Sequence, residues 1–202
     1  MDCSLSSMMC AHMILDVSSD ADLHLVTERF EIGMYGESPG IIDMAEWPIA
    51  NPKWLSKTGF DHPNEGDTAI RSSWLKKSMA ISLAGRGAEF HTGTRTTEVD
   101  MDTKTATLSY PGAKSETKIK FDHIVTPSEG ANRVWRGAVT NDPPTWEAIT
   151  GRRPDRTYEV WWEGAGEPLN PLQVMEWKGQ DPRLALREAI ARAVTKLGNI
   201  EK

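Results

Sequence analysis

Hydrophobic residues recur at helical spacing in three segments of the chain. The first, Met8–Leu15, is a short apolar run behind several serines that can cap its first turn. The second, Ile70–Ala84, spaces its large apolar residues for one buried face, and Gly85 follows at its end. The third starts at Asp181 and Pro182, a typical cap and first-turn pair. Its expected apolar stripe, which Gly198 should end, consists of Leu186, Ile190, Val194 and Leu197.

Shorter apolar or alternating runs between turn residues predict strands. Leu23–Val26 and Glu89–His91 are expected to be extended, whereas residues 29–63 contain many Gly and Pro and predict irregular structure. Three runs separated by turn pairs predict an antiparallel β-meander. These runs are Thr96–Asp100, Thr105–Tyr110 and Thr117–Phe121. Ile124–Val125 is expected to be a buried strand, and Tyr158–Trp162 with Leu172–Trp177 a strand pair.

Composition restricts the class of protein. The 202 residues, 39% hydrophobic and 26% charged, suit one full globular domain or one and a half small ones. A formal net charge of −6 disfavours nucleic acid and anionic membranes as partners. No apolar run approaches the roughly 18 residues of a membrane span, and no basic segment of a signal peptide is seen. We expect a cytoplasmic protein with no membrane span and no nucleic-acid partner.

Other chemical motifs in the sequence are weak. Gly36–Gly40 (GESPG) matches the G-x-S-x-G nucleophile motif, but Pro39 has no N–H to help bind an oxyanion. Asp61 and His62, with acidic residues after them, lack the spacing of a metal motif, and the two cysteines, Cys3 and Cys10, form no zinc motif. We therefore expect no metal site and assign no catalytic residue.

A carboxylate follows the strand Leu23–Val26. A strand that ends in an acidic residue, about 20 residues after the turn that opens a helix, is typical of a nucleotide-binding βαβ unit. In such a unit the carboxylate binds ribose hydroxyls, and the pyrophosphate lies at the helix N-terminus. Counting back from Glu28 places Asp2, Ser4 and Ser7 where glycines usually stand. The spacing fits, the residue types differ, and the first strand of the unit has no room before Asp2.

A later segment resembles a known family. Ser128–Arg136 (SEGANRVWR) is similar to the A-D-G-A-N-S-x-V-R segment of FAD-dependent oxidoreductases of the Rossmann-like class. That class contains aromatic-ring monooxygenases, geranylgeranyl reductases, lycopene cyclases and flavin-dependent halogenases. Leu25–Arg29 (LVTER) resembles its V-x-V-L-E-R strand end, and Gly87–Arg95 (GAEFHTGTR), behind an Arg-led helix, resembles its G-A-x-x-x-x-G-T-x-V string. The resemblance covers residues 3–136.

The resemblance implies a cofactor site for FAD, with NAD(P)H as a candidate electron donor. In such a site Glu28 binds the adenosine ribose, the backbone near Thr96 flanks the adenine, and Glu129 takes the place of the family's Asp. The cofactor-binding residues that it implies are Ser4, Ser7, Glu28, Arg29, Arg71, Thr96, Glu129 and Gly130. The implied substrate is a hydrophobic small molecule, and the Trp-rich segments 47–54 and 158–177 are expected to line its binding site. Aromatic core filling is the alternative role for the eight tryptophans.

The predicted fold class is α/β. We expect a Rossmann-like FAD-binding layer without its first strand and an antiparallel β-meander over residues 1–136. A small C-terminal α+β segment over residues 137–202 would lie on the substrate side or act as a cap. Two functions stay open. One is an FAD-dependent oxidoreductase of the monooxygenase or reductase type. The other is a non-catalytic relative or incomplete gene product that keeps the scaffold for folding or partner binding, with an open sheet edge that could pair with another chain.

The residues at the expected phosphate turn weaken the flavin prediction. Ser4 and Ser7 add side chains where the backbone should approach phosphate closely, and Asp2 adds a negative charge there. We therefore expect weak flavin retention or none.

Overall fold

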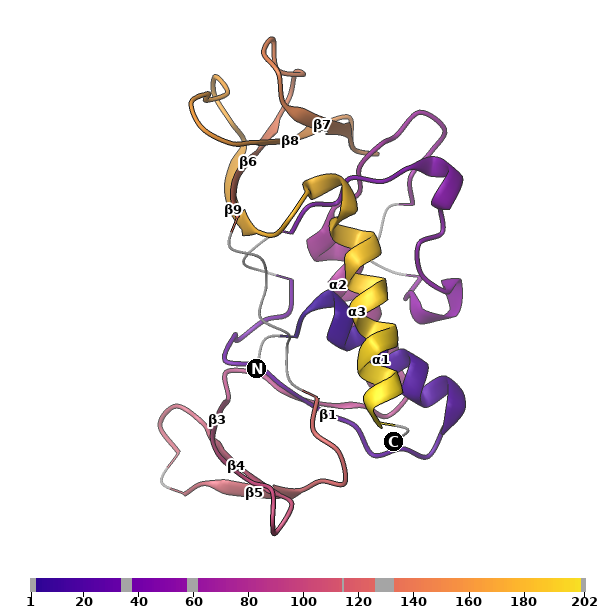
Figure 1. The fold of residues 1–202 in the computed structure, drawn as a ribbon, viewed down its shortest axis with the longest axis vertical. Helices are drawn as coiled ribbons and strands as arrows, with labels where there is room; N and C mark the ends of the chain where they lie inside the picture. The colour runs from indigo at the N-terminus through magenta and orange to yellow at the C-terminus, as the bar shows by residue number, and fades with distance from the viewer. Residues whose placement is uncertain (1–2, 34–37, 58–61, 114, 126–132, 201–202) are drawn as a thin grey trace.

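The computed structural model describes residues 3–33, 38–57, 62–113, 115–125 and 133–200. It is a mixed helix and strand fold in which the helices lie between a four-stranded sheet at one end and a three-stranded sheet at the other (Figure 1). The helices are α1 (Leu5–Val17), α2 (Ser72–Gly85) and α3 (Ala185–Ile200), with 3-10 turns at Met44–Glu46, Pro52–Trp54 and Pro182–Leu184. The strands are β1 (His24–Val26), β2 (Glu89–His91), β3 (Arg95–Asp100), β4 (Thr105–Ser109), β5 (Thr117–Lys120), β6 (Val134–Thr140), β7 (Ile149–Arg152), β8 (Tyr158–Trp162) and β9 (Gln173–Lys178).

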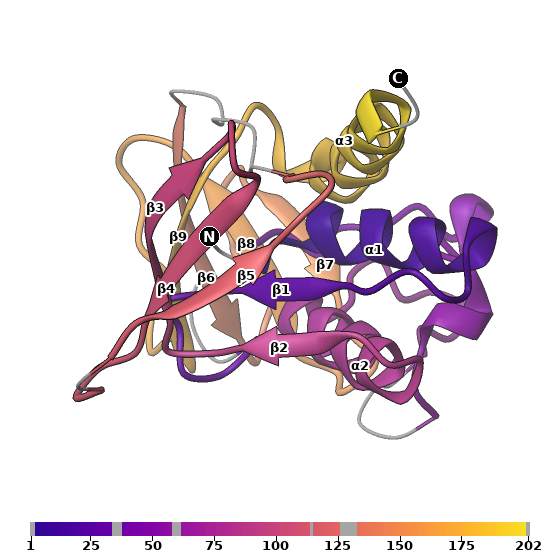
Figure 2. The same cartoon turned by 90° about the horizontal axis from the view of Figure 1, so that it is seen from below.

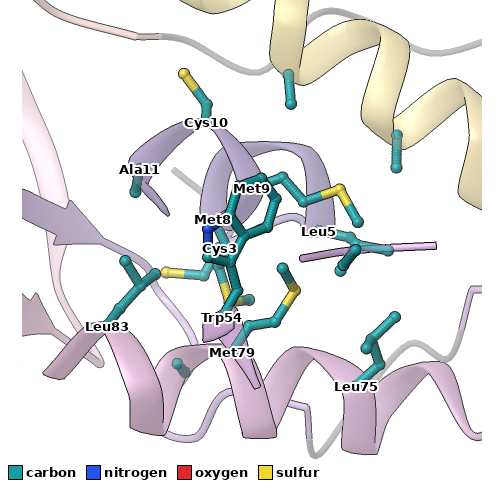
Figure 3. Close-up of a cluster of buried hydrophobic side chains, with 14 of the residues drawn as sticks. Cys3, Leu5, Met8, Met9, Cys10, Ala11, Trp54, Leu75, Met79 and Leu83 are labelled. Atoms are coloured by element: carbon teal, nitrogen blue, oxygen red, sulfur yellow. The ribbon is translucent and has the colours of Figure 1, made fainter. Parts of the chain in front are cut away.

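The main core lies between α1, α2 and α3. Met8, Met9 and Met79 are fully buried in it, and Trp54 of the second 3-10 turn packs among them (Figure 3). Burial of one such side chain stabilises the fold by roughly 1.5–3 kcal/mol, and unbranched methionines fill the irregular gaps between helices that cross. The predicted helices are confirmed, and Ser4 is the cap of α1.

A parallel pair, β1 and β2, lies beside these helices, with His24 opposite Glu89 and Val26 opposite His91. Both strands have three residues. Within the described residues these two strands are the whole parallel sheet, which is smaller than the layer expected from the sequence.

The β-meander is confirmed. Strands β3, β4 and β5 form an antiparallel sheet in chain order, and Asp100 fixes the first turn by accepting the N–H groups of Asp102 and Thr103. The strand expected at Ile124–Val125 is wrong, because these residues have no strand conformation and the next strand is β6. Two apolar residues are too few to specify a strand, whose usual length is about five.

The four-stranded sheet has the order β7-β8-β6-β9, with every pair antiparallel. The strands expected at Tyr158–Trp162 and Leu172–Trp177 are present as β8 and β9, but they do not pair with each other because β6 lies between them. Trp135 and Trp161 fill the core of this sheet.

Helix α3, near the C-terminus, packs against helix α1, near the N-terminus. The chain enters α3 from a 3-10 turn capped by Asp181, as predicted, but the helix runs past Gly198 to Ile200. Its buried face contains Leu186, Ala189 and Ala193, whereas Val194 is exposed, so the expected stripe is wrong in that position. The expected boundary between residues 136 and 137 falls inside β6, and α3 packs in the same core as α1. None of the helices described here is long and apolar enough to cross a membrane.

Candidate functional site

The chain topology brings the starts of two helices to one edge of the parallel pair. Helix α1 leads by a short connection into β1, and α2 leads likewise into β2. Each helix therefore runs opposite to its strand and begins at the edge where both strands end, as Figure 2 shows. Ser4 caps α1, Arg71 occupies the N-cap position of α2 without a capping hydrogen bond from its side chain, and Glu28 follows β1, so these sequence-predicted residues share one edge.

Glu28 is held at this edge by the residues that follow β2. The backbone N–H of Thr27 donates to the carbonyl of His91, that of Thr94 donates to Thr27, and that of Gly93 donates to Arg29. The Glu28 carboxylate is 61% exposed, and its Oε1 lies 3.4 Å from Nε of Arg95. Exposure on this side leaves the carboxylate free to accept hydrogen bonds from a sugar hydroxyl.

Arg29 follows Glu28 directly in the chain, and Thr96 is next to Arg95, the residue that pairs with Glu28. Thr96 is half-buried in β3, directly after Arg95, and pairs with Leu108 of β4. A register irregularity follows between Thr96 and Glu98 and leaves the ladder interrupted there. The structure thus brings Glu28, Arg29 and Thr96 together at one corner.

The first turn of α1 contains three linked hydroxyls. Ser4 Oγ lies 3.1 Å from Ser6 Oγ and 3.0 Å from Ser7 Oγ, and it accepts the N–H of Ser7 at 3.3 Å. The N–H groups of Leu5 and Ser6 in this turn have no acceptor inside the helix, as at every helix start. These groups and the helix dipole favour an anion at this position.

A lysine from the other end of the chain reaches the same turn. Lys196 Nζ in α3 donates to Ser6 Oγ at 3.2 Å and to Ser7 Oγ at 3.1 Å, and only 8% of the residue is exposed. Burial is the main cause that lowers the pKa of Lys196, Cys10 opposes this shift and Arg192 adds to it, and no carboxylate of the described residues forms an ion pair with Lys196. A buried cation next to a positive helix end is unfavourable unless an anion binds nearby.

Sequence reasoning missed Lys196, although a signal for it exists. The buried face of α3 recurs at Leu186, Ala189 and Ala193, and the next position of the same face is Lys196. A lysine at a buried position of an amphipathic helix is rare, and its ammonium needs a polar partner. The two serines of α1 are that partner.

Arg71 points toward the four-stranded sheet. Its Nη2 lies 3.7 Å from Oδ2 of Asp155, between β7 and β8, and its guanidinium lies 5.0 Å from the centroid of the Trp74 ring. Glu129 and Gly130 lie outside the described residues, as do Asp61 and part of the GESPG match.

A groove of about 440 Å³ lies beside the four-stranded sheet. Its wall includes Arg136, Trp162, Pro168, Pro171, Val174 and Met175. Most of the predicted tryptophan wall is core instead. Trp54 stacks on His12 with ring centroids 5.4 Å apart, and Trp161 is fully buried. Among the tryptophans of the described part, Trp162 is the one that lines this groove.

Several solved structures share the fold of this chain. PieE, a flavin-dependent monooxygenase solved with FAD and substrate, has a TM-score of 0.62 at 8% identity over 99% of this chain and 56% of PieE. BexE, studied for oxidation in BE-7585A biosynthesis, has a TM-score of 0.60 at 11% identity over 95% of this chain and 59% of BexE. Aklavinone-11 hydroxylase, solved with FAD and aklavinone, has a TM-score of 0.57 at 11% identity over 96% and 59%.

The fold is that of flavin-dependent monooxygenases. The chain spans less than 60% of the length of these three proteins. No protein-family model matches the sequence, and no curated protein matches it. The resemblance read from the sequence is thus confirmed at the level of fold.

Proposed function

We propose that the chain is an FAD-dependent oxidoreductase of the monooxygenase type that acts on a hydrophobic small molecule. The observation that carries the proposal is the shared edge of β1 and α1, where an exposed carboxylate and an anion-favouring helix start lie together. This edge occurs in a chain whose fold matches FAD enzymes over 95–99% of its length.

The residues at this edge fit the adenosine diphosphate part of the cofactor. Glu28 accepts hydrogen bonds from the ribose hydroxyls, and Arg95, 3.4 Å away, orients the carboxylate. The pyrophosphate lies at the first turn of α1, where Lys196 supplies the positive charge that glycine-rich turns do not need. Bound FAD supplies the redox chemistry, with NAD(P)H as the proposed donor of electrons.

The groove beside Trp162 is the proposed substrate site. Its wall combines an aromatic ring with Val174 and Met175, and its charged residues are Arg136, Glu167 and Glu176. Apolar walls with a few polar groups are typical of small-molecule sites. A flat hydrophobic substrate without a negative charge suits this composition, because the acidic residues of the wall outnumber its single arginine.

Titration of the purified full chain with FAD, ADP and AMP tests the nucleotide site. We expect weak binding of FAD and ADP, measured by calorimetry and by the visible difference spectrum. Glu28→Gln and Lys196→Met should each weaken ADP binding by about tenfold or more, the loss of one charge-assisted hydrogen bond or ionic contact. Glu98→Gln on β3 and Lys120→Met on β5 are exposed and serve as matched controls.

A specific observation favours the alternative, a non-catalytic relative. The Lys196 ammonium and three hydroxyl groups already form hydrogen bonds with one another at the α1 turn, so these groups have polar partners without a ligand. A folded chain that binds neither FAD nor ADP would overturn the proposed function and support this relative. In that case the edge of β1 opposite β2, which has no strand partner in the described residues, becomes the proposed surface for a partner chain, to be measured by sedimentation.

A further inference from the structure

A cluster of metal-ligating side chains lies on one face of the β1–β2 pair, on residues that the nucleotide site does not use. His24 of β1 stands opposite Glu89 of β2 in the parallel register, and His91 follows Glu89 by two residues. Because side chains alternate along a strand, Glu89 and His91 point to the same face, which His24 shares. These residues lie far apart in the sequence, so no spacing motif announces them.

The three ligand atoms are spaced for one small ion. His24 Nδ1 lies 2.9 Å from His91 Nε2 and 3.4 Å from Glu89 Oε2, and all three atoms lie within 4.8 Å of one another. In a tetrahedral zinc site with bonds of about 2.0–2.2 Å, neighbouring ligand atoms are about 3.3–3.5 Å apart. The His24–Glu89 separation already has this value, the two histidine nitrogens would move apart by about 0.5 Å, and the third separation is no longer than 4.8 Å.

The other ring nitrogens have the partners that metal-bound histidines use. His24 Nε2 lies 3.4 Å from the Asp22 carboxylate, and His91 Nδ1 lies 2.7 Å from the Tyr110 hydroxyl. Such outer hydrogen bonds fix the tautomer and aim the free lone pair at the metal.

One side of the cluster is open to solvent. The side chain of His24 is 24% exposed and that of Glu89 is 62% exposed, whereas His91 is buried. An ion can enter from this side and keep a water molecule as its fourth ligand. Two imidazoles and a carboxylate form a donor set that suits Zn²⁺ and neighbouring divalent transition metals.

We propose that His24, Glu89 and His91 form a mononuclear site for a divalent transition metal ion such as Zn²⁺. The ion cross-links β1 to β2, and Tyr110, which follows β4, ties the site to the meander. The site does not depend on the proposed flavin function.

Calorimetric titration of the chelator-treated full chain with Zn²⁺ alone tests the site, and Co²⁺ gives a second readout through its visible absorption. We expect one ion per chain, a tetrahedral or five-coordinate cobalt spectrum, and a higher Tm with zinc. His24→Gln, Glu89→Gln and His91→Gln should each weaken binding by about 100-fold or abolish it, and Tyr110→Phe by about 10-fold through the outer hydrogen bond.

His123→Gln is the matched control, because His123 is exposed and lies outside the cluster. Circular dichroism checks that each variant is folded, and if His91→Gln does not fold, the more exposed His24→Gln and Glu89→Gln decide the matter. The proposal is overturned if the folded chain binds no stoichiometric zinc. It is also overturned if zinc binds His24→Gln and Glu89→Gln as tightly as it binds the parent chain.

Discussion

The buried imidazole of His12 should make the stability of this protein depend on pH. His12 is fully buried between α1 and α2. Its Nε2 lies 3.2 Å from the carbonyl oxygen of Met79, and its Nδ1 lies 3.0 Å from Nη1 of Arg86. The ring must therefore donate from Nε2 and accept at Nδ1, which is the neutral tautomer. A second proton would face a guanidinium.

The magnitude follows from the pKa. Burial is the largest cause that lowers the pKa of His12, from 6.5 to about 4, with Arg86 lowering it and Asp16 opposing. At neutral pH both the folded and the unfolded chain hold a neutral ring, so nothing is lost. As the pH falls below 6.5, the unfolded chain binds the proton first, and the folded state loses stability until the pH passes about 4. Between about pH 7.5 and pH 5 the loss is about 2 kcal/mol, since one pKa unit is worth ~1.4 kcal/mol.

The assay is chemical denaturation of the parent chain and His12→Gln at both pH values. Glutamine can donate to Met79 and accept from Arg86 but cannot titrate, so the variant should lose about 2 kcal/mol less stability on acidification. For a protein of this size that difference is about 4–8 °C in Tm. The exposed residue His123 again supplies the control variant, His123→Gln, which should follow the parent chain. If His12→Gln loses as much stability as the parent chain, the neutral tautomer is wrong.

Two further predictions concern the four-stranded sheet. Gly137→Ala should destabilise the protein by about 1–3 kcal/mol in urea denaturation, because a Cβ there would lie 2.5 Å from the buried Trp161 ring. Gly85→Ala is the control and should be neutral, because a Cβ at Gly85 would have no atom within 4 Å. Glu159→Gln should cost about 3–5 kcal/mol, because the fully buried Glu159 carboxylate accepts from Nη2 of Arg153 at 2.5 Å and a neutral amide cannot form this buried ion pair. Double substitution with Arg153→Met should recover part of this loss, and equal stability of the single and double variants would contradict the argument.

The sequence predicted well the elements whose signals are local. The serine cap of α1, which the structure assigns to Ser4, the stop after α2 and the turn after Asp100 each depend on hydrogen bonds within a few residues. Such signals need no knowledge of the remaining chain. The position of Glu28 near the start of α1 could be predicted for a related reason. A helix that leads by a short connection into a strand begins near the end of that strand.

The errors arose where distant segments decide the local structure. Glycine is typical of turns, yet Gly151 lies inside strand β7. Glycine is needed there because a Cβ would lie 2.7 Å from the backbone carbonyl oxygen of Thr68. The pairing of β8 and β9 through β6 depends on a strand from the middle of the chain. The role of Lys196 likewise appears only when α3 is packed on α1. No window of sequence contains these contacts.

The position of Glu28 depends on a sheet that could not stand alone. Two parallel strands of three residues bury too little surface and make too few hydrogen bonds for independent stability. Their register is fixed by α1 and α2 on one side and by the ladder from Thr27 to Thr94 beyond the strand ends. The contact of His24 with His91 adds a side-chain link across the same pair, four residues before the carboxylate. A metal ion bound by His24 and His91 would hold β1 and β2 together and would thereby restrict the position of Glu28, which follows β1. The proposed metal site and the proposed nucleotide site therefore depend on the same pair of strands.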